Sequence, residues 1–364
     1  MLARILWWRH DLEQLDAEAV AAVITALESA QRDIADRLAS EAAGLARLSG
    51  WRREQDEALN AWADEVLAGA RATVTGVVSE ASIAAATASL AAYNAMMTLD
   101  GMASAVKSVG LSSAQIRAWF QDTPLGAGLL DDWVDAAFDN GVKQSILAAL
   151  RQVAVEGKGT AEAVRRVLVA ASDAGFTLTR REAVTLTRTF VQTANVRAQE
   201  AVYRANEGLF KGYRYVATLD NKVCLICALA DGAEYKLDEP RPRLPRHPRC
   251  RCLYLPIAKS WRDFGIDMDG LEAVARPWVL RAPGPLGAGG RKIENVGQTT
   301  ENYSGWWALL SPADKARTAI GKARRGLLES GAMTWEQLWD KATGRPYTLR
   351  ELGYDAAGKR LGGR

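Results

Sequence analysis

Apolar side chains recur every three or four residues along much of the N-terminal part of the chain, which is the period of a half-buried α-helix. One such run covers residues 11 to about 48 and stops before Gly50. A second runs from Trp51 to about Thr98 and is rich in Ala, Ser and Thr. Small residues let two backbones approach closely, so the pattern predicts two long, closely packed helices.

Shorter helical segments follow, separated by turn signals such as Asp100–Gly101 and the loop at 123–128. The predicted helices are SAQIRAWFQ, capped by Ser112 or Ser113, then residues 129–155, 161–174 and 180–206, the last ended by Gly208.

After Gly208 the apolar pattern changes to a period of two, which is typical of a half-buried strand. We expect strands over residues 210–218, 233–237 and 252–257, with an irregular Pro- and Arg-rich loop over 239–249. The helix and these strands form a small α/β unit that is too poor in apolar residues to hold its loop unaided.

The C-terminal third contains a Gly/Pro stretch, APGPLGAGGRK at 282–292, which indicates a linker or extended arm over 259–301. Helices are expected again over 302–364. Ser311 followed by Pro312 predicts one helix start, and Thr334 is expected to cap another, MTWEQLWDKA.

The predicted fold class is therefore mainly α, with long N-terminal helices, a small α/β module stabilised by zinc and a helical C-terminal tail. The predicted regions are a helical region for partner binding at 1–140, the module at 141–258 with its metal site at 218–256, the linker at 259–301 and the tail at 302–364.

Composition places the chain in an ordinary globular class. Its 364 residues include 48% hydrophobic and 24% charged residues. The net charge of +3 is too small to indicate a nucleic-acid-binding protein. No apolar run reaches the ~20 residues that a membrane helix requires, and we expect no membrane anchor. The opening MLARILWWRH is too short and interrupted for a signal peptide, and it suits either internal packing or an anchor onto a partner.

All four cysteines lie within 218–256, together with one of the two histidines. The order is Cys-x2-Cys, a spacer of 19 residues, and then His-x2-Cys-x-Cys. A close Cys pair followed by a second short arm of His and Cys is the spacing of a tetrahedral zinc site. Five donors compete for four positions, and the spacing does not choose between the last two cysteines. The candidate ligands are Cys224, Cys227, His247, Cys250 and Cys252.

Two simpler interpretations of the cysteines fit their spacing less well. Isolated cysteines are often small buried hydrophobes, but four of them gathered at ligand spacing are not typical of that role. Disulfides are disfavoured by the metal-like spacing and by the lack of a secretory signal.

A structural metal is favoured over a catalytic one. Zinc deaminases carry His-x-Glu before Pro-Cys-x-x-Cys, whereas here the Cys pair comes first and His247 is followed by Pro248 and Arg249. Histidine-dependent chemistry would need a second histidine, and His10 in the N-terminal segment is the other one in the sequence. We therefore expect a closed zinc site and no enzymatic activity.

The loop that carries His247 is also rich in arginine, and guanidinium groups suit phosphate oxygens. A solvated face is the simpler interpretation, and any DNA contact should be independent of sequence and sensitive to salt. The candidate DNA contacts are Arg241, Arg243, Arg246, Arg249 and Arg251.

Three runs from about Arg180 to Ile257 together resemble the phage head morphogenesis domain of the Mu F and SPP1 minor head protein family. They are RREAVTLTRTFVQTANVRAQEAVYRAN, GYRYVATLDNKVCLICALADG and PRLPRHPRCRCLYLP, with Thr218, Asp220 and Asp231–Gly232 also fitting. A second run, from YSGWWALLSPADKARTAIGKARRG onward, resembles the tail of Mu-type minor head proteins, although Trp306–Trp307 replaces the usual Trp-Leu start.

The resemblance implies a minor capsid protein of a tailed bacteriophage, with roles in head assembly and in DNA packaging or delivery. Implied partners are the portal protein and capsid or scaffold proteins, with several copies in the particle. The implied locations are the capsid interior or portal vertex, and the host cytoplasm during assembly. The alternatives are a metal-stabilised DNA-binding protein, or a toxin or nuclease fused to a head-morphogenesis module.

Overall fold

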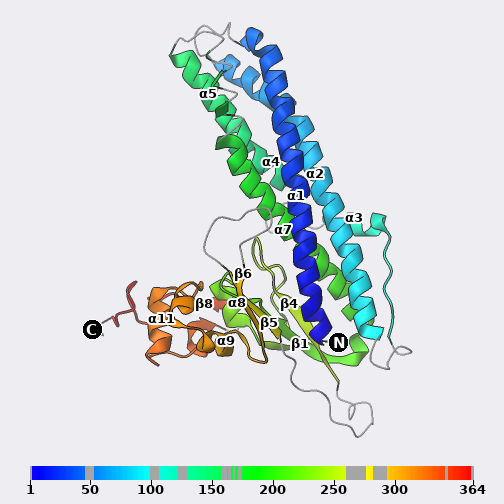
Figure 1. Ribbon diagram of the computed structural model, residues 1–364, viewed down its shortest axis with the longest axis vertical. Helices are drawn as coiled ribbons and strands as arrows, with labels where there is room; N and C mark the ends of the chain where they lie inside the picture. The colour runs from blue at the N-terminus through cyan, green and yellow to red at the C-terminus, as the bar shows by residue number, and fades with distance from the viewer. Residues whose placement is uncertain are drawn as a thin grey trace.

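A long helical bundle with a small α/β unit at one end makes up the protein (Figure 1). The computed structural model describes residues 2–45, 53–98, 106–121, 129–156, 162, 165–166, 169–170, 174–259, 276–281, 293–340 and 343–361. The predicted fold class, mainly α with a small α/β module, is confirmed.

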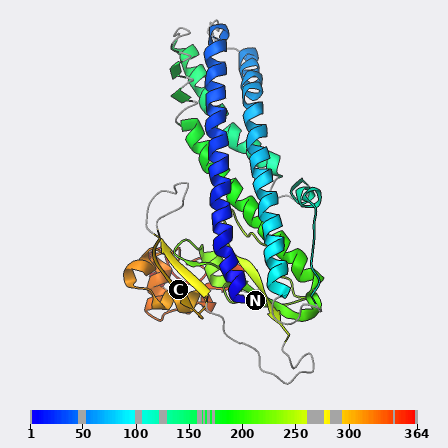
Figure 2. The same cartoon turned by 45° about the vertical axis from the view of Figure 1, so that its right-hand side comes forward.

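Three long helices form the bundle, and Figure 2 shows them running side by side. They are α1 (Leu2–Leu45), α2 (Arg53–Thr98) and α7 (Ala174–Ala205). At 1.5 Å per residue, the 44 residues of α1 span about 65 Å. The bundle continues through α4 (Leu130–Phe138), a π-helical turn η1 (Asp139–Lys143) and α5 (Gln144–Val155), while α3 (Ser113–Gln121) packs on α2.

The sequence pattern placed most of these helices correctly. Val23, Leu27 and Ile34 line the buried face of α1, and small residues bring α2 close to its neighbours. Helix α7 begins at Ala174, about six residues before its predicted start. Most of the predicted helix at 161–174 lies outside the described residues.

A polar cluster lies inside the bundle where α7 crosses α1 and α2. The side-chain oxygen of Asn195 accepts hydrogen bonds from Trp8, Ser89 and Tyr93 at 3.2, 3.1 and 3.2 Å. Trp8 therefore takes the internal-packing role that was one of the two expectations for the N-terminal segment.

The α/β unit begins where α7 ends. After a 3-10 turn, η2 (Glu207–Leu209), the antiparallel sheet β3–β1–β4 forms from Glu234–Lys236, Phe210–Val216 and Leu253–Ala258. Gly212 is required here because a side-chain carbon at that position would overlap the backbone oxygen of Tyr235 across the strand pair.

The predicted linker at 259–301 is wrong for its described residues. β5 (Arg276–Arg281) and β6 (Ile293–Thr299) form a second sheet in the order β2–β5–β6, with β2 at Leu219–Asp220. The linker was predicted from the Gly/Pro-rich run between the two strands. The strand β5 is stabilised by pairing with β2, which lies more than 50 residues earlier and leaves no local signal. Residues 260–275 and 282–292 lie outside the described part.

The C-terminal unit is helical only in part. Its helices are α9 (Tyr303–Leu309), α10 (Pro312–Ala316), α11 (Lys322–Glu329) and the 3-10 turn η4 (Glu336–Leu338). Ser311 caps α10 with Pro312 at its first position, as predicted. The predicted helix MTWEQLWDKA is wrong, because Trp339 leaves the short turn to pair with Pro346 in the two-stranded sheet β7 (Trp339–Asp340) and β8 (Arg345–Pro346).

By length and composition, helix α2 could cross a membrane over Glu57–Met97. Within its most apolar window, 44% of the residues are buried inside the protein, and bundle helices commonly pass the same test. The length and composition of α2 are therefore weak evidence for a membrane span.

Candidate metal centre

Two short segments bring the five predicted donors together. Cys224 is the N-cap residue of α8 (Leu225–Ala230), and Cys227 lies in the first turn of that helix. On the second segment, the Cys250 N–H donates to the His247 carbonyl at 3.0 Å. This turn requires the left-handed backbone of Arg249, at φ 60°, and aims the second arm at the first.

Donor atoms from the two segments lie close together. The Nε2 atom of His247 is 3.0 Å from the Cys224 sulfur and 3.2 Å from the Cys227 sulfur, and the Cys227 and Cys250 sulfurs are 3.9 Å apart. A tetrahedral zinc ion would set these separations at roughly 3.6 Å for S···N and 3.8 Å for S···S, from Zn–S and Zn–N bonds of about 2.3 and 2.0–2.1 Å. The residues could therefore hold a metal ion.

Two groups of donors share Cys227. Cys224, Cys227 and His247 form one, and Cys227, Cys250 and Cys252 form the other, each with ligand atoms within 4.8 Å of one another. The Cys250 sulfur lies 3.9 Å from that of Cys227, and the Cys250 N–H donates to the His247 carbonyl. This position beside the histidine makes Cys250 the better candidate for the fourth position.

The pKa values of the donor groups are shifted in opposite directions. Hydrogen bonds from Cys227 and His247 lower the pKa of the Cys224 thiol to about 4, and sharing a proton with Cys224 raises the pKa of Cys227. Contacts with Cys224 and Cys250 raise the pKa of His247 to about 10. Burial raises the pKa of Cys252. Closely packed thiols cannot all ionise without a cation, so an ion that binds here displaces protons.

Two contacts outside the donor group fix its orientation. The His247 Nδ1 atom lies 2.8 Å from the Pro248 carbonyl, so an Nδ1–H can donate there and leave Nε2 as the metal-facing nitrogen. The Tyr215 hydroxyl donates to the Cys227 sulfur at 3.3 Å from the neighbouring strand.

Residues 144–255 match the family described as Phage Mu protein F like protein. This segment belongs to the phage Mu F-like family. No curated protein and no solved structure matched the chain. The match ends before the C-terminal unit, so the resemblance of that unit to Mu-type tails stays a prediction.

In the Mu F-like segment, Asp220 is a fully buried member of an ion-pair network that the sequence did not reveal. Arg251, which lies between the two candidate cysteines, donates to both Asp220 oxygens, one of them at 3.0 Å. Glu13 of α1 pairs with Arg281 of β5 at 2.6 Å and approaches Arg251 at 3.7 Å. The network joins the metal loop to the first helix and to the second sheet.

Asp231 is the centre of a second network. Arg276 donates to both of its oxygens at 2.8 and 3.1 Å, and the Tyr303 and Ala217 backbone N–H groups donate to it at 2.6 Å. Both aspartates belong to the sequence runs that resemble the head morphogenesis domain. Their arginine partners are 31 and 45 residues away, so no local signal could have paired them.

Four of the five predicted DNA-contact arginines are engaged within the protein. Arg251 pairs with Asp220, and Arg249 donates to the Thr185 hydroxyl at 2.9 Å. Arg246 donates to the Gly344 carbonyl at 2.7 Å, and Arg241 stacks 4.1 Å above the Tyr213 ring. Arg243 is exposed. The side chain of His10 lies outside the described residues.

Proposed function

We propose that this chain is a minor head-morphogenesis protein of a tailed bacteriophage that acts near the portal, in head assembly and in DNA packaging or delivery. The observation that carries the proposal is the Mu F-like match, which covers the module holding the predicted metal ligands. The long bundle supplies an extended surface for portal, capsid or scaffold partners.

The metal in this proposal is zinc, bound by Cys224, Cys227, His247 and Cys250. Three thiolates and one imidazole suit zinc in a closed tetrahedral site. Zinc supplies cross-linking energy between α8 and the Pro-rich loop. Structural zinc contributes roughly 10–16 kcal/mol of apparent binding energy in small peptides, which is ample to fix one loop.

The site's surroundings favour a structural role. A catalytic zinc needs an open coordination position and a nearby acid or base. The two buried carboxylates near the donors, Asp220 and Asp231, are both held by arginines. Assays of nuclease and ADP-ribosyl transfer with and without EDTA test this part, and we expect no turnover in either condition.

Locating the chain in particles tests the proposed function. An affinity-tagged chain expressed during infection is expected to copurify with heads and to be placed at the portal vertex by gold labelling. A chain that is absent from both procapsids and mature heads contradicts the proposal.

The hypothesis of DNA contact by the arginine loop now rests mainly on Arg243, because the other four guanidinium groups have partners in the protein. Replacing Arg243 with Ala is expected to weaken salt-sensitive duplex binding. Equal binding by the variant removes the loop as a DNA contact.

A further inference from the structure

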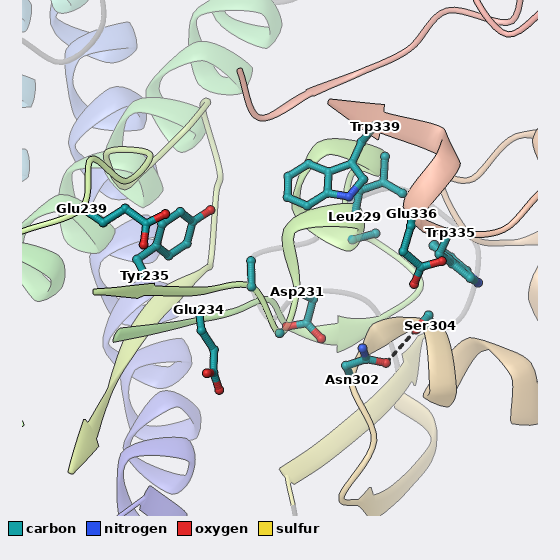
Figure 3. Close-up of a pocket in the computed structure, with 13 residues that line it drawn as sticks. Leu229, Asp231, Glu234, Tyr235, Glu239, Asn302, Ser304, Trp335, Glu336 and Trp339 are labelled. Carbon is teal, nitrogen blue, oxygen red and sulfur yellow. Dashed lines mark hydrogen bonds between the residues drawn. The ribbon is translucent and has the colours of Figure 1, made fainter. Parts of the chain in front are cut away.

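A cavity of about 310 Å³ opens between the metal module and the C-terminal unit (Figure 3). One wall is the segment from Ala228 to Tyr235 with Glu239, and the other comes from Asn302, Ser304 and the η4–β7 turn. Its volume is at the low end of the ~300–1,000 Å³ range of ligand pockets, which suits one long side chain with its flanking backbone. Neither the metal nor the proposed head function accounts for it.

Three aromatic side chains line the cavity. Tyr235 comes from β3, and Trp335 and Trp339 come from the turn that replaces the predicted C-terminal helix. Ring faces attract cations. The same chemistry occurs elsewhere in the chain, where Lys315 lies 4.6 Å above the Trp307 ring.

Charge in the cavity is of one sign. Among the described lining residues there are four carboxylates and no lysine or arginine, although the whole chain has a net charge of +3. The carboxylates are Asp231, Glu234, Glu239 and Glu336.

Two of these carboxylates keep capacity to bind a ligand. Glu234, whose side chain is 53% exposed, receives both of its Arg214 hydrogen bonds on one oxygen. Glu239 uses one oxygen for the Lys236 N–H. Among the described residues, the second oxygen of each has no hydrogen-bond partner. Asp231 differs, because Arg276 and two backbone N–H groups already occupy it.

We propose that this cavity binds the basic side chain of an arginine- or lysine-bearing segment of another protein. The aromatic rings receive the stem and face of the cation. Glu234 and Glu239, which lie on opposite sides of β3 (Figure 3), accept N–H groups of the segment. Phosphate groups are repelled by the same carboxylates, so the partner is a polypeptide and not a nucleic acid. The proposal goes beyond the proposed head function, since it assigns a partner chemistry to a surface outside the metal site.

The test is a titration of the metal-loaded full chain labelled with 5-fluorotryptophan, followed by ¹⁹F NMR. Trp335→Phe and Trp339→Phe variants assign the two cavity resonances. The probes are a capped Gly-Ser-Arg-Ser-Gly peptide, its citrulline counterpart, which has the same shape without the charge, and spermidine.

We expect the arginine peptide to shift the Trp335 and Trp339 resonances and the citrulline peptide not to. Glu234→Gln with Glu239→Gln is expected to weaken binding about tenfold. The matched control is Glu65→Gln with Glu80→Gln on α2, whose side chains are 74% and 69% exposed, and it should leave the affinity unchanged. Glu239→Gln alone, with a smaller loss, replaces the double variant if that variant fails to fold.

Equal shifts from the citrulline peptide, or an equal loss in the control variant, overturn the proposal. So does binding of spermidine as tight as that of the peptide, which identifies a polyamine site. Absence of any shift also overturns it. The titration uses the isolated chain, so a chain missing from phage heads contradicts the proposed function without changing this result.

Discussion

Cys252 is the side chain whose role the structure changes most. Spacing alone made Cys250 and Cys252 equivalent, since residues two apart on a strand share a face. In the fold, Cys250 lies in the loop beside His247, with its N–H bonded to the His247 carbonyl, while Cys252 immediately precedes β4. Both cysteines come before the strand, so the alternation of strand residues does not relate them.

Serine substitutions separate the ligands from the spare thiol. Cys224→Ser, Cys227→Ser or Cys250→Ser is expected to release the metal, because each removes one of four ligands. Cys252→Ser is the matched control and is expected to keep one metal per chain. Metal content by ICP mass spectrometry checks this, and loss of metal in Cys252→Ser alone would reverse the assignment.

Asp16 on α1 makes stability depend on pH. Burial raises its pKa from 3.8 to about 6, although Arg188 at 3.1 Å opposes the rise. A carboxyl whose folded pKa is raised stabilises the folded state below its unfolded pKa, and that stabilisation is lost as pH rises through the folded pKa. The affected window is therefore about pH 4–6.

Comparison with Asp16→Asn isolates this effect. The free energy of unfolding of the wild type relative to the variant is expected to increase as pH falls from 7 to 4, by up to about 3 kcal/mol. Urea unfolding at matched pH values measures it, and other titrating groups cancel in the difference. A difference that is flat or falls across this window contradicts the assignment.

Among the elements, β5 connects the parts of the chain. It pairs with β2 and β6, and its two terminal arginines reach the buried aspartates of both networks. Because β5 joins the module to the first helix through these ion pairs, this part of the predicted linker is a folded element of the structure.

Arg276→Ala is expected to loosen this connection by leaving Asp231 buried with backbone donors alone. Removing one partner of a buried ion pair lowers the free energy of unfolding by about 3–5 kcal/mol. We expect a loss at the lower end of this range, because backbone N–H groups still donate to Asp231. Hydrogen exchange should accelerate in β5, β6 and α9 and stay slow in α2.

Arg345→Ala is the control for that substitution, because its pair with Glu351 is exposed on both sides. We expect exchange in this control to match the wild type. Equal acceleration in both variants would mean that Asp231 does not hold β5 in place.

The sequence predicted the elements with strong local periodicity and missed those that depend on distant partners. The bundle helices and the cysteine turn have their signals in adjacent residues. β5 follows 260–275 and precedes the Gly/Pro run, and its partner β2 is only two residues long, so no local pattern marked it. The last helix was overpredicted because Trp335, Leu338 and Trp339 have helical spacing. In the structure, Trp335 and Trp339 line the cavity, and Trp335 packs against Tyr303 and Trp307.

In the molecule as a whole, the bundle and the metal module differ in their dependence on the metal. One apolar core runs from α1, α2 and α7 into the strands of the metal module. The proposed zinc cross-link between α8 and the His247 loop would add stability to the module alone. We expect metal removal by a chelator to unfold the module while the N-terminal helices persist.

Hydrogen exchange before and after chelation checks this expectation. Protection should be lost in β1, α8 and β4 and retained in α1 and α2. The charged network between Glu13 and Arg281 gives α1 one direct link to the module, so exchange at the first turns of α1 is expected to rise modestly. Simultaneous loss of protection along the whole of α2 would contradict an effect of the metal that is confined to the module.

X-ray absorption at the zinc edge of the purified full chain is the decisive measurement. We predict one zinc per chain with three sulfur ligands at about 2.3 Å, one nitrogen at about 2.0–2.1 Å and no water oxygen. A chain that takes up no zinc under reducing conditions contradicts the proposed site, as does a zinc with an oxygen ligand in an open fourth position.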